Sequence, residues 1–160
     1  MGQEMRTRTL SFVSFEPYDG AFRAFLSIHT ALGADPNPED LAQDAAAIYQ
    51  SFIEQMRSAI ERINDLRRTH TPVPARRVWQ LGDLVFRLKS ELGELGLELD
   101  GVYEHLTRDL SVKRKWLEKV VILRRYVDEV SRIPERLNWG RVEKGTAKAS
   151  RRINDGLPPD

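Results

Sequence analysis

The sequence predicts an all-α protein with a long helical pair, a helix-turn-helix, a basic C-terminal helix and a short N-terminal extended segment. Apolar residues recur at steps of three and four over residues 38–68 and again over 78–95, as on one face of a helix. Two further helical patterns meet at Ser111, and only residues 7–15 combine β-branched and aromatic types as a strand does. The 160 residues suit one domain, or one domain with an extension.

Residues 1–70 are predicted to hold the extended segment and a long helix used for dimerisation or packing. Without a second convincing strand, the segment at 7–15 either pairs with another subunit or forms an ordered arm. After a turn at 16–20, residues 21–32 are expected to form a short helix. Asn37 and Pro38 suit the N-cap and first position of a helix that runs to about Arg68. At ~1.5 Å per residue this helix is roughly 45 Å long, so we expect an equally long partner in this chain or in a second one.

Residues 71–154 are predicted to form the helix-turn-helix region. Prolines at 72 and 74 separate the long helix from a second helix, and Gly93 and Gly96 end or weaken that helix. Its stripe has a heptad-like spacing and consists of Val78, Leu81, Val85, Leu88, Leu92 and Leu95. Such a stripe either pairs with the preceding helix or forms a dimer seam.

The stretch from Val102 to Tyr126 has the sequence form of a helix-turn-helix. Thr107, Ser111 and Leu117 stand where the motif needs a small residue, a turn residue and an apolar residue, at steps of four and six. Ser111 can also cap the second helix through its hydroxyl. The alternative is a helical hairpin whose second helix carries solvated charges.

A last helix is expected over about residues 135–153, followed by a flexible tail at 155–160. Cations recur on one side of this helix, opposite its apolar side. With Leu117 inward in the preceding motif, the cations of that second helix also turn outward. The candidate DNA-contacting residues from both helices are Lys113, Arg114, Lys115, Lys119, Arg124, Arg125, Arg141, Lys144, Lys148 and Arg151.

Charge is distributed unevenly although the net charge is only +1. Residues 1–70 carry seven Arg and ten acidic residues, which gives −3, whereas residues 105–160 carry fourteen cations and eight acidic residues, which gives +6. A basic C-terminal third indicates an anionic partner. We therefore expect a non-enzymatic protein that binds double-stranded DNA as a homodimer. The alternative is a helical assembly subunit, such as a coat, scaffold or complex component, that self-associates through its long helices.

Five short motifs occur in order between residues 79 and 139. They are Trp79-Gln-Leu-Gly82, Leu106-Thr-Arg-Asp-Leu110, Lys115-Trp-Leu117, Leu123-Arg-Arg-Tyr126 and Leu137-Asn-Trp139. Together they resemble the N-terminal helical region of the bacterial YhcG-type nuclease family. The resemblance covers about residues 76–140 and implies DNA association through a winged-helix-like or related module. In that family a nuclease domain follows this region. Because the resemblance covers only the helical region, we expect DNA association and no nuclease activity to carry over.

Other chemistries find no support in the sequence. The three His residues are scattered without metal-ligand spacing, the chain has no Cys, and no glycine-rich phosphate-binding motif occurs. We therefore expect no catalytic residues, no metal, no cofactor and no small-molecule substrate. No apolar run approaches the ~18 residues of a membrane span, and the N-terminus lacks a signal region, so we expect a cytoplasmic protein without membrane contact.

Overall fold

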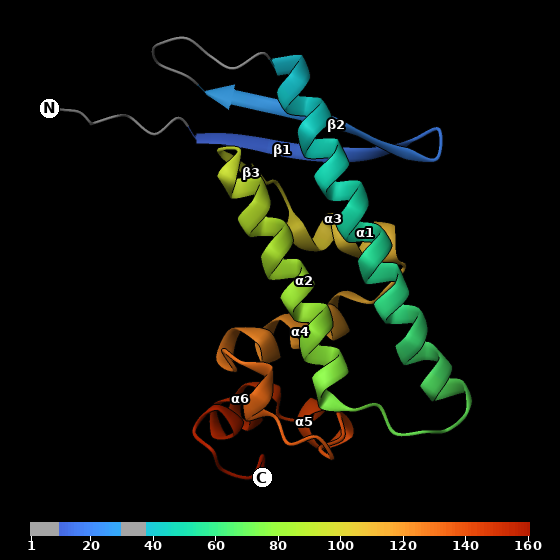
Figure 1. The fold of residues 1–160 in the computed structure, drawn as a ribbon, viewed down its shortest axis with the longest axis vertical. Coiled ribbons are helices and arrows are strands. Elements are labelled where there is room, and N and C mark those ends of the chain that lie inside the picture. The colour runs from blue at the N-terminus through green and yellow to red at the C-terminus, as the bar shows by residue number, and fades with distance from the viewer. Residues whose placement is uncertain (1–9, 30–37) are drawn as a thin grey trace, which may run out of the picture.

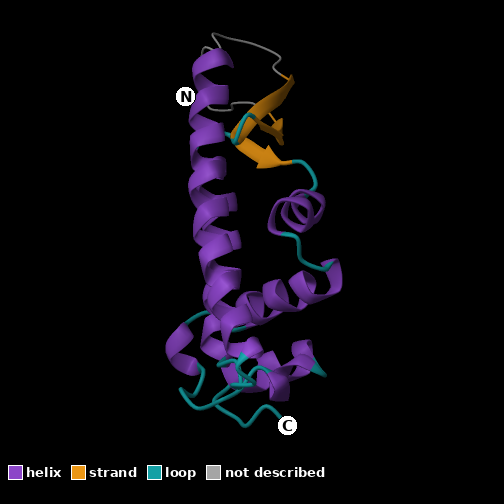
Figure 2. Cartoon of the chain, turned by 90° about the vertical axis from the view of Figure 1, so that its right-hand side faces the viewer, coloured by secondary structure: helices purple, strands orange, loops and turns teal. Residues whose placement is uncertain are grey.

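The computed structural model describes residues 10–29 and 38–160, and these form a mixed α+β fold. The prediction of an all-α protein is therefore wrong. A three-stranded sheet lies beside the N-terminal end of the longest helix, and short helices gather at the opposite end of the molecule (Figures 1 and 2).

The sheet begins with a β-hairpin formed by β1 (Leu10–Tyr18) and β2 (Ala21–His29). The predicted helix at 21–32 is wrong where the structure describes it, and residues 30–32 lie outside the described part. The turn residues Asp19 and Gly20 both have positive φ, 50° and 79°, which is the backbone that a two-residue hairpin turn needs. Residues 21–27 alternate between half-buried and exposed side chains, as a strand packed on one face does.

A third strand, β3 (Leu97–Leu99), pairs in parallel with β1, so the strand order is β2-β1-β3. The sequence does not predict this strand, because three residues carry too little periodicity to be distinguished from a loop. The predicted N-terminal extended segment is thus present over residues 10–18, but it pairs within its own chain.

Two long helices, α1 (Pro38–Arg68) and α2 (Ala75–Glu94), run side by side in opposite directions (Figure 1). Both occur where the apolar spacing predicts them, and Gly96 just beyond α2 has a φ of 78°. Five of the six residues of the heptad-like stripe are no more than 1% exposed within the single chain: Val78, Leu81, Val85, Leu88 and Leu92. These residues are therefore occupied by intramolecular packing and do not form a free dimer seam.

The remaining helices that the structure describes are α3 (Val102–Leu110), α4 (Arg114–Tyr126), α5 (Gly140–Glu143) and α6 (Thr146–Asn154), and the 3-10 turn η2 (Val130–Arg132) lies between α4 and α5. The single last helix predicted over 135–153 is wrong, because α5 and α6 are separated there. The physical reason is the backbone at Gly145, whose φ of −142° and ψ of 65° are not helical.

One hydrophobic core joins the sheet to the helices. Val13 and Phe15 of β1 are fully buried, and the Phe15 ring stacks on Tyr49 of α1 with ring centroids 4.2 Å apart. At the other end, the main chain of Trp139 donates to the Val73 carbonyl at 2.7 Å. The connection between α1 and α2 is thereby fixed to the segment that precedes α5.

Candidate nucleic-acid interface

The predicted helix-turn-helix corresponds to α3 and α4, joined by residues 111–113. Ser111 adopts the left-handed conformation, with φ 56° and ψ 45°, and ends α3. The N-cap of α4 is Lys113, and no side chain caps this helix. The expectation that Ser111 caps the second helix is therefore wrong, because Ser111 lies two residues before the N-cap.

Helix α4 packs closely against α2 at Gly82. A Cβ atom at this glycine would lie 2.8 Å from both the Arg124 Cβ and the Val120 carbonyl oxygen. Leu117 and Val120 are fully buried, as the sequence predicts for the inward face of the motif. The close crossing fixes which positions of α4 can reach solvent.

Helix α4 contains five cations and one Glu, but two of the cations are held by carboxylates. Arg114 donates to Glu104 at 2.8 Å and to Glu118 at 3.0 Å. Arg124 donates to Asp83 of α2 at 2.9 Å, and only 21% of its side chain is exposed.

Arg124 also lies in an aromatic setting within the α2–α4 contact. Its guanidinium carbon is 4.9 Å from the Trp79 ring centroid and 4.7 Å from that of Phe86. Trp79 in turn donates its indole N–H to the Val127 carbonyl at 2.7 Å. Arg124, a candidate DNA contact by sequence, therefore connects α2 and α4 instead of facing solvent.

The other cations of this region extend outward. Lys113, Lys115 and Arg125 are exposed and Lys119 is half-buried, and the side chains of these four residues make no hydrogen bond or ion pair within the described part of the chain. Lys115, Lys119 and Tyr126 follow steps of four and seven, so they share one face of α4.

Tyr126 connects this face of α4 to α6. The Arg151 guanidinium carbon lies 4.9 Å from the centre of the Tyr126 ring. A hydrogen bond from Arg151 and, after it, the positive charge of Arg151 lower the pKa of the Tyr126 hydroxyl. Through this contact the face of α4 that carries Lys115 and Lys119 continues onto Arg151 of α6.

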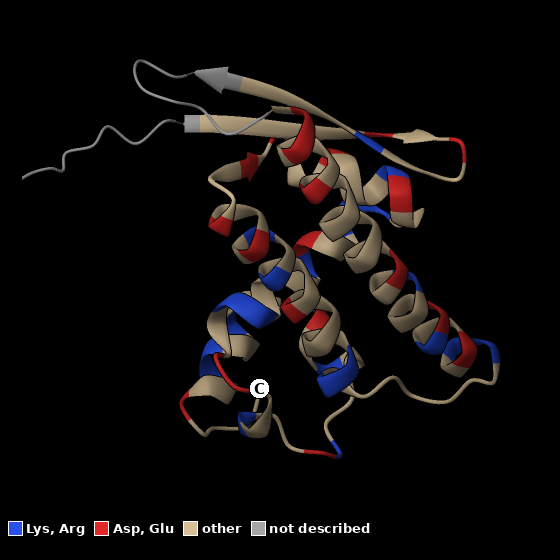
Figure 3. Cartoon of the chain, turned by 45° about the horizontal axis from the view of Figure 1, so that its top comes forward, with Lys and Arg blue, Asp and Glu red and all other residues tan. Residues whose placement is uncertain are grey.

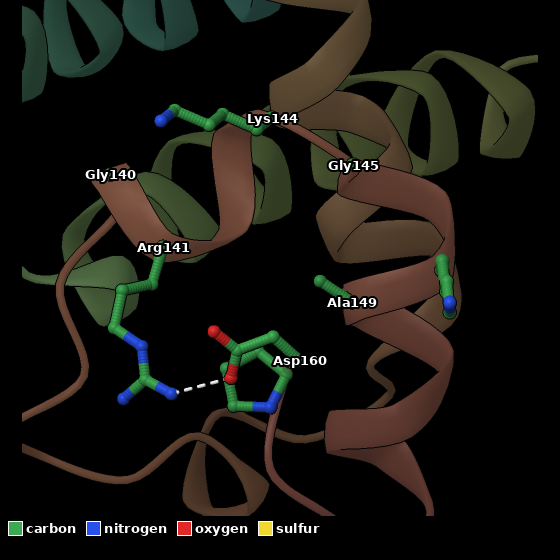
Figure 4. A pocket seen from close by; sticks show the side chains of 8 residues that line it. Gly140, Arg141, Lys144, Gly145, Ala149 and Asp160 are labelled. Carbon is green, nitrogen blue, oxygen red and sulfur yellow. Dashed lines mark hydrogen bonds and ion pairs between the residues drawn. The ribbon is translucent and has the colours of Figure 1, made fainter.

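A cavity of about 390 Å³ lies between α5 and α6 (Figure 4). Three exposed cations, Arg141, Lys144 and Lys148, line it together with Gly145, which precedes α6, and Ala149 of α6. Arg141 donates to the Asp160 carboxylate at 2.6 Å. Neither lysine side chain makes a hydrogen bond or ion pair with any other residue that the structure describes.

Both signs of charge occur along the two long helices (Figure 3). Helix α1 carries six acidic residues and four Arg, whereas α6 carries three cations and no acidic residue. The excess of positive charge predicted for the C-terminal third is therefore concentrated on α4 and α6. We call the set Lys113, Lys115, Lys119, Arg125, Lys144, Lys148 and Arg151 the basic surface.

A buried polar cluster around Asp109 was not predicted as a unit. The Tyr49 hydroxyl donates to one carboxylate oxygen of Asp109 at 2.5 Å, and Arg108 donates to both oxygens. Arg108 also donates to the Phe15 carbonyl at 2.7 Å, and the Phe15 N–H donates to Nε2 of His105 at 2.8 Å. The cluster joins β1, α1 and α3.

Burial affects the two acidic groups of this cluster differently. Desolvation raises the pKa of the Tyr49 hydroxyl, and the hydrogen bond to Asp109 raises it further. Desolvation also acts to raise the pKa of Asp109, but hydrogen bonds from Arg108 and Tyr49 outweigh it and lower that pKa below its usual value. In the sequence, this cluster is indicated only by the neighbouring charges of Arg108 and Asp109. These two residues lie inside the predicted helix-turn-helix, which is assigned from the spacing of other residues.

Within residues 10–29 and 38–160, no group of three or more His, Asp or Glu side chains is arranged to hold a metal ion. None of the helices described there is both long enough and apolar enough to cross a membrane.

No protein-family model matches this chain, and no curated protein or solved structure shows significant similarity to it. The resemblance to the YhcG-type family stays a prediction.

Proposed function

We propose that this protein binds double-stranded DNA through the basic surface on α4, α5 and α6. The observation that carries the proposal is a set of six cations without a carboxylate partner in the described chain: Lys113, Lys115, Lys119, Arg125, Lys144 and Lys148. Unpaired cations can neutralise phosphates without first breaking an internal ion pair.

The dimensions of the surface suit a duplex. Lys115 and Arg125 are ten residues apart on one helix, which corresponds to ~15 Å along its axis. That distance equals the rise of about four base pairs, so the cations can follow one strand of the backbone. Arg151, which lies over Tyr126, continues the same surface onto α6.

Two of the ten candidates from sequence, Arg114 and Arg124, are set aside in this proposal. Arg141 pairs with the exposed Asp160, so it is not counted among the six unpaired cations. Arg114 donates to Glu104 and Glu118, and Arg124 donates to Asp83, all at 3.0 Å or less. An arginine that contacts DNA must give up such partners, and this reduces the gain from the phosphate.

The test compares Lys115→Ala/Lys119→Ala with the charge-matched variant Arg62→Ala/Lys89→Ala. The latter removes two exposed cations of α1 and α2 that have no ion pair within the described residues. Affinity for a labelled 20-base-pair duplex is measured by fluorescence anisotropy at two salt concentrations. We expect the first variant to lose affinity by about tenfold and its salt slope to fall by about two, and the control to match the wild type.

Two results would overturn the proposal: no duplex binding by the wild type at low salt, or equal losses in both double variants. Light scattering on the same samples measures the oligomeric state, for which the homodimer remains the expectation. The assembly subunit remains the alternative. Val78, Leu81, Val85 and Leu88 are buried within the chain, so self-association would have to use another surface.

A further inference from the structure

The cavity between α5 and α6 already binds an oxyanion that belongs to the chain itself. Arg141 reaches from α5 to the Asp160 carboxylate, whereas Lys144 extends from the end of α5 in another direction (Figure 4). Lys148 lines the same cavity from α6. Three cations therefore line the cavity, but the Asp160 carboxylate inside it forms an ion pair with Arg141 alone.

The route of the chain after α6 explains how Asp160 arrives there. The Leu157 N–H donates to the Arg152 carbonyl at 2.8 Å, and Gly156 between them has a φ of 80°. This is the geometry with which a helix ends and the chain reverses. Arg152 Nε then donates to the Pro158 carbonyl at 2.7 Å, which directs the following residues back toward α5.

We infer that this cavity is a phosphate-binding site, and that Asp160 occupies the place of the phosphate when no ligand is bound. A phosphate carries more negative charge than a carboxylate and has a further oxygen, so at the place of Asp160 it gains more from Arg141 and from the positive charges of the two lysines that line the cavity. The backbone N–H groups at the start of α6, which no side chain caps, add favourable dipoles on the same side.

Displacement of the Asp160 carboxylate from Arg141 costs little free energy. The Arg141 and Asp160 side chains are 55% and 70% exposed, and ion pairs this exposed are weak. The site thus combines a strong intrinsic preference for phosphate with a competitor that leaves easily. The inference deepens the proposed function, since a DNA backbone is one source of such a phosphate and the free ion is another.

Titration with inorganic phosphate tests the site directly, with the amide signals of Gly145 and Ala149 as local reporters in NMR spectra of the full chain. We expect phosphate to shift these signals in the wild type. Asp160→Asn should tighten phosphate binding by about two- to fivefold, because the competing carboxylate is removed. Asp155→Asn removes an exposed carboxylate of the same segment that has no ion pair in the described chain, so its affinity should equal that of the wild type.

Lys144→Ala/Lys148→Ala should weaken phosphate binding, whereas Lys115→Ala/Lys119→Ala on α4 should leave it unchanged. The inference is overturned if phosphate does not shift the two reporters, or if Asp160→Asn and Asp155→Asn bind phosphate equally. Failure of the proposed function is distinguishable, because a wild type that binds inorganic phosphate here but no duplex retains the site and loses the DNA assignment.

Discussion

Asp109 connects three parts of the molecule through a single carboxylate. It accepts from Tyr49 of α1 and from Arg108, and Arg108 extends the contact to the main chain of β1. The main-chain carbonyl of Asp109 also accepts from Arg57 at 3.1 Å. Because the Asp109 side chain is only 2% exposed, these donors are not replaced by water when the charge is lost.

Asp109→Asn should therefore lower the free energy of unfolding by about 2 kcal/mol, as expected for hydrogen bonds to a charged group. Urea denaturation at neutral pH measures the change. Asp65→Asn is the control, since it breaks an exposed pair with Arg68 on α1 and should cost less than about 0.5 kcal/mol. Equal effects of the two substitutions would refute the assigned role of Asp109.

The same carboxylate gives a pH dependence with a defined sign. The folded-state pKa of Asp109 lies below its unfolded value, so its stabilising contribution is present above the unfolded value. That contribution is lost as pH falls from about 4 through the depressed folded-state pKa. The stability difference between wild type and Asp109→Asn should shrink over this acid range, as followed by urea denaturation at stepped pH. A difference that stays constant would show that the charge is not responsible.

At the scale of elements, the contact between α2 and α4 determines which cations reach solvent. Leu117 and Val120 were expected inward and are buried, but Arg124 is also drawn inward by Asp83 and two aromatic rings. Helical spacing alone predicts both Arg124 and Arg125 as DNA contacts. These neighbours differ because α2 places the Asp83 carboxylate and the rings of Trp79 and Phe86 beside Arg124.

Gly82→Ala tests this crossing, because the added Cβ would lie 2.8 Å from backbone and side-chain atoms of α4. Overpacking of this kind should destabilise the protein by about 1–3 kcal/mol in thermal or urea unfolding. Gly93→Ala, also in α2, is the matched control, because its Cβ would meet nothing within 4 Å. That variant should be neutral or more stable by about 0.4–1 kcal/mol. An unaffected Gly82→Ala would mean that the helices do not cross as described.

For the whole molecule, one core links the sheet, the long helices and the C-terminal helices. The division of the chain at about residue 70, which the sequence predicts, stays a prediction. The three Trp residues all lie at or beyond position 79, whereas the hairpin lies before position 30. Tryptophan fluorescence therefore reports on the part of the fold after residue 70, whereas far-ultraviolet circular dichroism reports mainly on helices that lie on both sides of that position.

If the shared core makes the protein cooperative, both signals should change at the same urea concentration. Phe15→Ala removes a ring stacked on Tyr49. It should lower the free energy of unfolding by about 3–5 kcal/mol and move the midpoints of both signals together to a lower urea concentration. Two separate unfolding transitions, of which Phe15→Ala shifts one and leaves the other unchanged, would instead support independent units on either side of residue 70.

The sequence by itself determined the long helices and the positions of α3 and α4, because apolar spacing at three and four residues reports directly on a buried helical face. It did not determine the hairpin partner β2, where Phe22, Phe25 and Leu26 suit a short helix as well as a strand. The Asp19-Gly20 turn was the local signal for a hairpin there.

Only the tertiary structure decided which cations are available, and the reason is physical. An ion pair depends on distance between elements that are far apart in sequence, as for Asp83 with Arg124 and Asp160 with Arg141. Helical periodicity describes the face on which a side chain lies, but it carries no information about the charge that another element places opposite. The basic surface was therefore predictable in its location, and the residues that form it were decided by the fold.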